Sequence, residues 1–259
     1  MVTRDTPWPE GTPCWVDLAV DDIDKAVTFY SGLLGWQIER GGEEVGGYSL
    51  ALVGGKQVAG IGPKMQAGMP TVWTTYLATE NADQMAEKIT AAGGQILMAP
   101  MDVMDLGRMV IAADPAGGVF GLWQAGKHTG YQLANEPGAV TWNENMSRDY
   151  DHNREFYAAV FGYHFGDIPD GGIRYATLDL PNGMVGGIGE LPKEAPAEVP
   201  AHWMNYFSVS STDAAVAKVR ELGGQVMQEP WDTPYGRMAL VSDDQGAFFS
   251  VMQPPVSNG

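Results

Sequence analysis

One long segment of the chain occurs twice, and this duplication limits the folds that the chain can adopt. VDLAVDDIDKAVTFYSGLLGW in the first half matches VTWNENMSRDYDHNREFYAAVFGY in the second, so Phe29-Tyr30 recurs as Phe156-Tyr157. Further along, AAGGQILMAP matches ELGGQVMQEP, and DPAGGVFGLWQ matches DDQGAFFSVMQ. Several unrelated matches in the same order indicate a tandem duplication.

Each half carries the same order of predicted elements twice. Residues 15–20 alternate and are rich in β-formers, which predicts a strand. The following helix is predicted to begin after Asp21-Asp22, which supply an N-cap, and to end at Gly35. Short strands follow at 36–40, 48–53 and 57–61, and the second module repeats the plan with a strand at 72–79, a helix at 81–92 and strands near 95–101, 108–113 and 119–124. The whole chain is therefore predicted to contain four βαβββ modules in an α+β fold.

The predicted boundaries follow from the position of the repeats. We predict a first domain over 10–125, a linker over 126–137, which has no clear periodicity, and a second domain over 138–255. Glycine pairs such as Gly54-Gly55 and Gly186-Gly187 are predicted to form hairpin turns.

The composition excludes several classes of function. The formal net charge is −17, which disfavours binding to nucleic acid or to an anionic membrane surface. No apolar run approaches the roughly 20 residues that cross a bilayer, and the N-terminus lacks the apolar region of a signal peptide. A single cysteine, Cys14, cannot form an intramolecular disulfide and is expected to be a packed, unreactive side chain. These features predict a cytoplasmic monomer or homodimer.

The duplicated pattern resembles the vicinal-oxygen-chelate superfamily, which contains glyoxalase I, extradiol dioxygenases and bleomycin-resistance proteins. The resemblance rests on three motifs. The first is a strand followed by Asp-Asp and by a helix that contains Phe-Tyr and ends at Gly-Trp. The second is a later helix that ends at Gly-Gly-Gln, and the third is Gly-Arg-Met followed by Asp-Pro-x-Gly. It covers nearly the whole chain and is greatest for two-domain bacterial glyoxalase-like proteins, some of which belong to antibiotic pathways. It implies that pairs of modules curl into two half-open barrels, each with a concave site. Either consecutive modules pair, or the first pairs with the fourth and the second with the third.

The resemblance also implies where metal ligands lie in metal-dependent members, on the first and last strands of a module. Counting from the repeated motifs places other residue types at the six matching positions: Trp15, Thr74, Gly121, Trp142, Met204 and Ser250. The sequence therefore predicts no metal and no other cofactor. A shift of two residues keeps the strand face and makes Asp17 and Glu144 candidates, with Glu144 and His202 the one pair that could hold a metal. Two ligands are fewer than the three usual at a catalytic zinc site.

Large flat side chains replace the ligands and predict a site for an aromatic compound. The candidate ligand-binding residues are Trp15, Asp17, Trp73, Tyr76, Arg108, Trp123, Trp142, Glu144, Trp203, Met204, Tyr206 and Arg237. The alternative is that the aromatic residues belong to the core. Asp17 and Glu144 are the catalytic candidates, since either could orient a ligand or act as a base. The alternative for these two is a salt bridge to Arg108 or Arg237.

The sequence thus predicts a metal-free, glyoxalase-like protein that binds a small aromatic or amphipathic metabolite, such as an antibiotic or its precursor, in clefts lined by Trp, Tyr and Met. A metal-dependent lyase or dioxygenase that uses Glu144 and His202 is one alternative. A cofactor-free enzyme of a hydroxylation pathway, with Asp17 or Glu144 as base, is another. His128 and His152 are predicted to be exposed to solvent.

Overall fold

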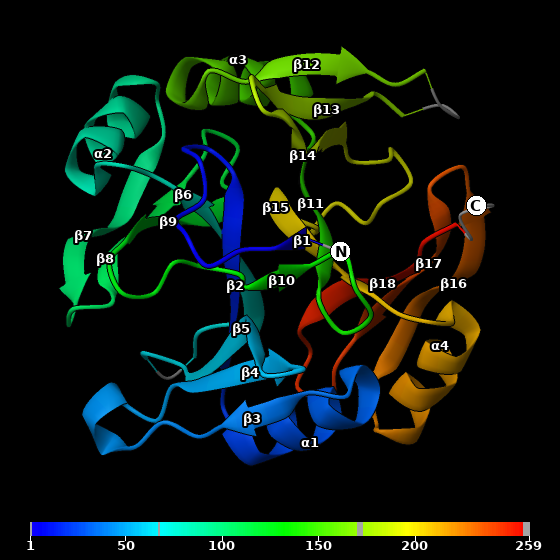
Figure 1. The fold of residues 1–259 in the computed structure, drawn as a ribbon. Helices are drawn as coiled ribbons and strands as arrows, with labels where there is room; N and C mark the ends of the chain where they lie inside the picture. Colours follow the sequence, from blue (N-terminus) through cyan, green and yellow to red (C-terminus); the bar gives the residue numbers. More distant parts are fainter. Residues whose placement is uncertain (1, 67, 170–172, 256–259) are drawn as a thin grey trace.

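The first half of the chain forms one eight-stranded sheet. A computed structural model describes residues 2–66, 68–169 and 173–255 (Figure 1). The strand order in this sheet is β3-β4-β5-β2-β6-β9-β8-β7. Its elements are β2 (Pro13–Val20), α1 (Ile23–Leu34), β3 (Gln37–Glu39), a 3-10 turn (Glu43–Val45), β4 (Ser49–Val53), β5 (Lys56–Pro63), β6 (Val72–Ala78), α2 (Ala82–Ala91), β7 (Gln95–Val103), β8 (Gly107–Ala113) and β9 (Val119–Ala125).

The second half repeats this sheet, in the order β12-β13-β14-β11-β15-β18-β17-β16. Its elements are β11 (Val140–Ser147), α3 (Tyr150–Phe161), β12 (His164–Asp167), β13 (Tyr175–Leu180), β14 (Gly183–Glu190), β15 (His202–Ser208), α4 (Thr212–Glu221), β16 (Gln225–Thr233), β17 (Gly236–Ser242) and β18 (Phe248–Gln253). The predicted α+β fold with four βαβββ modules is confirmed. A short pair, β1 (Val2–Thr3) with β10 (Leu133–Ala134), ties the N-terminal segment to the chain between the sheets.

Local signals define the ends of the helices. Asp22 caps α1, because its carboxylate accepts the Lys25 amide hydrogen at 3.0 Å. Gly35 ends the helix with a φ of 71°, in the left-handed region that glycine adopts without strain. The prediction for Gly186-Gly187 is wrong: both residues lie inside β14, whereas Gly54 and Gly55 do form a turn with positive φ.

Consecutive modules share a sheet, joined at its centre by antiparallel strands. In the first sheet Trp15 lies opposite Tyr76. In the second sheet Trp142 lies opposite Tyr206, and Glu144 opposite Met204. Because side chains alternate along a strand, each sheet has one face that carries Asp17 or Glu144. We call it the carboxylate face, and the opposite side, which α1–α4 cover, the helix face.

The helix faces of the two halves pack against each other, so that the first module contacts the fourth and the second module contacts the third. Phe29 on α1 contacts Phe249 on β18, with ring centroids 6.4 Å apart, and Phe120 on β9 contacts Phe156 on α3 at 6.4 Å. Accordingly α1 lies beside α4 and α2 beside α3 (Figure 1). Of the two arrangements left open by the sequence, consecutive modules therefore pair to form each sheet. The first and fourth modules, like the second and third, share only a core between their helix faces. Among the described residues, no helix is long and apolar enough to span a bilayer.

Candidate functional site

The carboxylate face of the second sheet is centred on Glu144, which is 8% exposed. The Tyr175 hydroxyl donates to one carboxylate oxygen at 2.7 Å, and the Tyr206 hydroxyl donates to the other at 2.7 Å. The Trp142 indole N–H in turn donates to the Tyr175 hydroxyl oxygen at 2.8 Å. Three side chains from three different strands therefore fix the orientation of this carboxylate.

The first sheet carries the same constellation around Asp17. The Tyr48 hydroxyl donates to Asp17 at 3.3 Å, and the Trp15 indole N–H donates to Tyr48 at 2.9 Å. Tyr76 also hydrogen-bonds to Asp17. One carboxylate, two phenols and one indole thus recur at matching positions of the two sheets.

Glycines on the neighbouring strands make room for the phenol rings. A Cβ atom at Gly60 would overlap the Tyr48 hydroxyl, and one at Gly187 would overlap the Tyr175 hydroxyl. Similarly, a Cβ at Gly121 would overlap the Tyr76 ring. The Tyr76 ring therefore occupies space that a side chain at position 121, the position matched to a family metal ligand, would need.

Burial dominates the electrostatics of both constellations. It raises the pKa of Asp17 to about 7 and raises the pKa of Glu144, while hydrogen bonds from the tyrosines oppose the shift. Burial and the adjacent Glu144 carboxylate also raise the pKa values of Tyr175 and Tyr206. These phenols consequently keep their protons at neutral pH and act as hydrogen-bond donors to the carboxylate.

The described side chains do not match the ligand set that the resemblance implies for metal-dependent members. Glu144 is the one carboxylate of its central strand pair, and both of its oxygens already accept phenol hydrogens. His202 lies opposite Met146 on the same face, and its Nδ1 hydrogen-bonds to the Pro200 carbonyl at 2.9 Å. In the described part of the chain, no three His, Cys, Asp or Glu side chains gather as a metal would require.

The structure divides the predicted ligand-binding residues among three places. Strand register places eight of them on the carboxylate faces: Trp15, Asp17, Tyr76, Trp123, Trp142, Glu144, Met204 and Tyr206. Trp73 and Trp203 instead lie on the helix faces, where their indole N–H groups donate to Tyr30 at 3.0 Å and Tyr157 at 2.8 Å. Their assignment to a ligand site is therefore corrected: these two tryptophans belong to the core between the halves.

Arg108 and Arg237 do not pair with the site carboxylates. Arg108 binds Asp83 at 2.9 Å and Asp102 at 2.8 Å. Arg237 binds Asp213 at 2.9 Å and Asp232 at 3.1 Å. The alternative salt bridges to Asp17 and Glu144 are therefore wrong, because each arginine ties the start of a helix to an edge strand instead.

Sequence reasoning missed Tyr48 and Tyr175 and misplaced His128. The glycines at positions 60 and 187 are a sequence signal for these tyrosines, because the lack of a side chain there leaves room for the two hydroxyls. His128 is not solvated as predicted: its ring centroid lies 4.3 Å from that of Trp15 and 5.5 Å from that of Trp123. Burial lowers the pKa of His128 to about 4.

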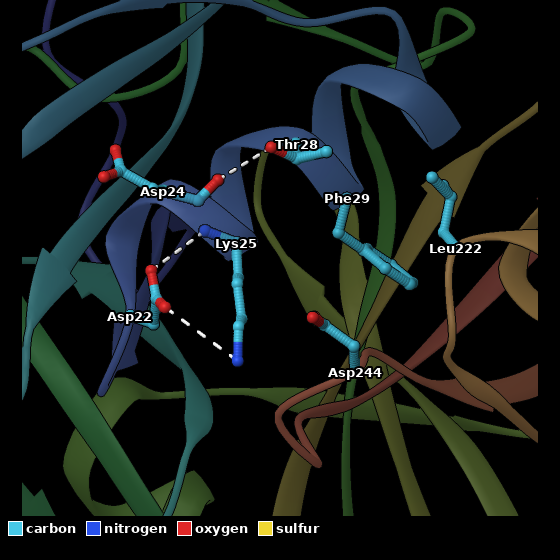
Figure 2. A pocket seen from close by; sticks show the side chains of 7 residues that line it. All are labelled: Asp22, Asp24, Lys25, Thr28, Phe29, Leu222 and Asp244. Atoms are coloured by element: carbon cyan, nitrogen blue, oxygen red, sulfur yellow. Dashed lines mark hydrogen bonds and ion pairs between the residues drawn. The ribbon is translucent and has the colours of Figure 1, made fainter.

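Two surface hollows lie away from both carboxylates. The larger, about 300 Å³, lies between α1 and the second half and is lined by Asp22, Asp24, Lys25, Thr28, Phe29, Leu222 and Asp244 (Figure 2). Lys25 approaches Asp22 to 4.0 Å there. The second hollow, about 270 Å³, includes Arg237 and Gln253. Neither has Asp17 or Glu144 in its lining.

Comparison with known proteins gives matches over nearly the whole chain. The model of the Glyoxalase/Bleomycin resistance protein/Dioxygenase superfamily matches residues 14–122 and 144–251. A putative glyoxylase, CFP32, from Mycobacterium tuberculosis (strain CDC 1551 / Oshkosh) is 41% identical over 252 residues, 95% of each chain. The anthracycline biosynthesis protein DauV from Streptomyces sp. (strain C5) is 37% identical over 263 residues, 96% of this chain and 95% of the relative.

Solved structures share the fold at low identity. The Mn(II)-bound glyoxalase from Novosphingobium aromaticivorans aligns with a TM-score of 0.64 and 16% identity, over 94% of this chain and 82% of that one. The 2,2',3-trihydroxybiphenyl 1,2-dioxygenase from Sphingomonas wittichii strain RW1 aligns with a TM-score of 0.64 and 13% identity, over 95% and 91%. Given the family match in both halves, the chain belongs to the Glyoxalase/Bleomycin resistance protein/Dioxygenase superfamily.

Proposed function

We propose that the chain binds a planar aromatic or amphipathic metabolite on the carboxylate face of its second sheet, without a metal ion. The observation that carries this proposal is the Glu144 carboxylate, held by Tyr175 and Tyr206 beside Trp142 and Met204. Trp142, Met204 and Tyr206 are only partly buried, so a ligand has surface to contact.

The roles of these side chains follow from their chemistry. The Trp142 and Tyr206 rings offer faces and edges on which a planar ligand packs. Met204 adds an adaptable apolar surface beside them. The Glu144 carboxylate, kept in one orientation by its two phenol donors, accepts a hydrogen bond from a ligand hydroxyl or amine. Apolar surface with a few placed polar groups is typical of small-molecule sites.

The relatives favour a polycyclic ligand. A protein 37% identical over 96% of this chain is named for anthracycline biosynthesis. Anthracycline-type compounds and their precursors are planar, fused-ring molecules that carry hydroxyl groups. That chemistry fits an indole, a thioether and a fixed carboxylate on one face, and it agrees with an antibiotic or its precursor as the ligand.

Tryptophan fluorescence tests the proposal, with 1,4-dihydroxyanthraquinone as the probe. We expect saturable quenching of the wild-type protein that EDTA leaves unchanged and that Trp142→Ala removes. Trp203→Phe is the matched control, because Trp203 lies on the helix face of the partner strand. Quenching that requires an added divalent metal, or that persists in Trp142→Ala, would count against the proposal.

A second candidate function is a cofactor-free enzyme with Glu144 as general base. The raised pKa of Glu144, caused by burial, favours it, since a base works best when its pKa approaches the working pH. Conversion of the bound probe or of a substrate analogue, lost in Glu144→Gln while binding persists, would identify this activity. Binding without conversion in both proteins would leave the simple binding function.

A further inference from the structure

The two carboxylate faces differ in what covers their tryptophans. Trp15 in the first sheet is 3% exposed, and the His128 ring stands nearly perpendicular to it, at an interplanar angle of 84°. The Tyr131 ring centroid lies 5.9 Å from that of Trp15. Both covering residues come from the segment between the two sheets, so the chain itself fills this face.

His128 is held much as a bound ligand would be. Its Nδ1 hydrogen-bonds to the Gln57 side-chain oxygen at 3.2 Å, and its backbone carbonyl accepts the Trp123 indole N–H at 2.8 Å. The Tyr131 amide donates to the Cys14 carbonyl at 2.7 Å and secures the segment beyond it. The lowered pKa of His128 leaves its imidazole uncharged at neutral pH. The occupant of this face is therefore an uncharged planar ring with one hydrogen-bonding edge between two indoles.

The second sheet carries the same carboxylate, phenols and first indole, with Met252 at the position of Trp123, and it has no such occupant in the described chain. Trp142 hydrogen-bonds to Tyr175 as Trp15 does to Tyr48. Trp142 is nevertheless half-buried, and among the described residues no ring packs on its indole as His128 and Tyr131 pack on that of Trp15. Within the described residues, an internal ring therefore covers the tryptophan of one copy, and the tryptophan of the other copy stays half-buried.

We infer that the two carboxylate faces are one ring-binding site present twice, that His128 of the same chain fills the first copy, and that the second copy takes a planar, uncharged ring ligand with a hydrogen-bonding edge. For the second copy this inference rests on the proposed function and narrows its ligand class. It also sets the stoichiometry at one ligand per chain.

Removal of His128 tests the inference directly, with imidazole as the probe. We expect His128→Ala to lose stability through the cavity it leaves and to regain it when imidazole is added. At a concentration about ten times its dissociation constant, imidazole should increase the ratio of folded to unfolded His128→Ala about elevenfold. His152→Ala, which removes an exposed histidine on α3, is the control and should show no recovery.

The wild-type stoichiometry provides a second measurement should His128→Ala fail to fold. Calorimetric titration with 1,4-dihydroxyanthraquinone should give one site per chain, and two equal sites would overturn the inference. The inference would also be overturned if His128→Ala folds and imidazole does not stabilise it. This holds even where the wild-type protein binds the anthraquinone, as the proposed function requires. Imidazole recovery without anthraquinone binding would instead overturn the proposed function and leave the assignment of the first copy standing.

Discussion

Tyr157 on α3 donates its hydroxyl hydrogen to Asp114, 3.0 Å away in the turn between β8 and β9 of the other half. The symmetric contact joins Tyr30 on α1 to Asp243 at 3.0 Å. Each phenol oxygen also accepts an indole N–H, from Trp203 or Trp73 respectively. The repeated Phe-Tyr and Asp motifs therefore recur because each half supplies both partners of a reciprocal contact between the helix faces.

Removing these hydroxyls should destabilise the chain unequally. Tyr30→Phe leaves Asp243 Oδ2 and the Trp73 N–H without this partner, and an unsatisfied buried polar group costs about 1–3 kcal/mol. Tyr157→Phe should cost less, because Asn145 and Asn153 still donate to Asp114 at 3.0 Å each. Urea unfolding measures both free energies.

The exposed Tyr235 supplies the control for this comparison. It is 53% exposed, so Tyr235→Phe should change the free energy of unfolding by less than about 0.5 kcal/mol. Equal losses in Tyr30→Phe and Tyr157→Phe would contradict the argument from the asparagine donors.

Local patterns were sufficient to predict most elements and the duplication. The helix Ile23–Leu34 has its cap and its terminal glycine in the sequence, so neighbouring residues determine its bounds. The prediction that Trp73 belongs to the ligand site is wrong for a local reason. Trp73 and Tyr76 are three residues apart on one strand and therefore point to opposite faces, so only Tyr76 lies on the carboxylate face.

Other features depend on contacts between segments that are distant in the chain. His128 lies in a segment without periodicity, and its burial arises from Trp15, more than a hundred residues away. The Tyr48 hydroxyl reaches Asp17 only because β4, β5 and β2 are neighbours and Gly60 leaves space. Such contacts require the strand register, which the sequence alone did not supply.

Asp17 should make stability depend on pH. Its folded-state pKa of about 7 exceeds the ordinary value of 3.8, so the folded chain binds this proton more tightly than the unfolded chain, and stability falls as pH rises from about 4 to 7. Asp17→Asn lacks this loss. Its free energy of unfolding relative to wild type should increase across that window by up to roughly 4 kcal/mol and then level off.

Asp5→Asn is the control for the pH series, since Asp5 is exposed. The change between pH 4 and pH 8 should be larger for Asp17→Asn than for this control. A flat difference for Asp17→Asn would show that burial does not hold the Asp17 proton in the folded chain.

Glu144 should discriminate between ligands by their hydroxyl groups. Under the proposed function the Glu144 carboxylate accepts a hydrogen bond from a ligand hydroxyl, and a hydrogen bond to a charged group contributes about 1.5–3 kcal/mol. Glu144→Gln should therefore weaken binding of 2,6-dihydroxyanthraquinone, whose hydroxyl hydrogens cannot bond to its own carbonyls, about tenfold or more, and binding of unsubstituted 9,10-anthraquinone far less. Fluorescence titration of both ligands against both proteins gives the comparison. An equal loss for the two ligands would mean that Glu144 acts on the shape of the site and not on a ligand hydroxyl.

Gly187 and Tyr175 should be strongly coupled in stability. A Cβ at Gly187 would overlap the Tyr175 hydroxyl, so Gly187→Ala must displace the phenol from Glu144, at a cost of about 1–3 kcal/mol for overpacking. In a Tyr175→Ala background the added methyl group no longer meets the phenol and keeps only a 3.1 Å contact with Trp142 Nε1, so the same substitution should cost less. The double-mutant cycle should thus give a coupling free energy of about 1–2 kcal/mol.

The distant Tyr235 provides the matched cycle. Gly187→Ala combined with Tyr235→Ala should be additive within about 0.5 kcal/mol, because the two sites share no contact. Displacement of the phenol also removes one donor from Glu144 and frees the Trp142 N–H. Gly187→Ala should therefore weaken anthraquinone binding together with stability. Additivity between Gly187 and Tyr175, or unchanged ligand affinity in Gly187→Ala, would show that the strand glycine does not position the carboxylate.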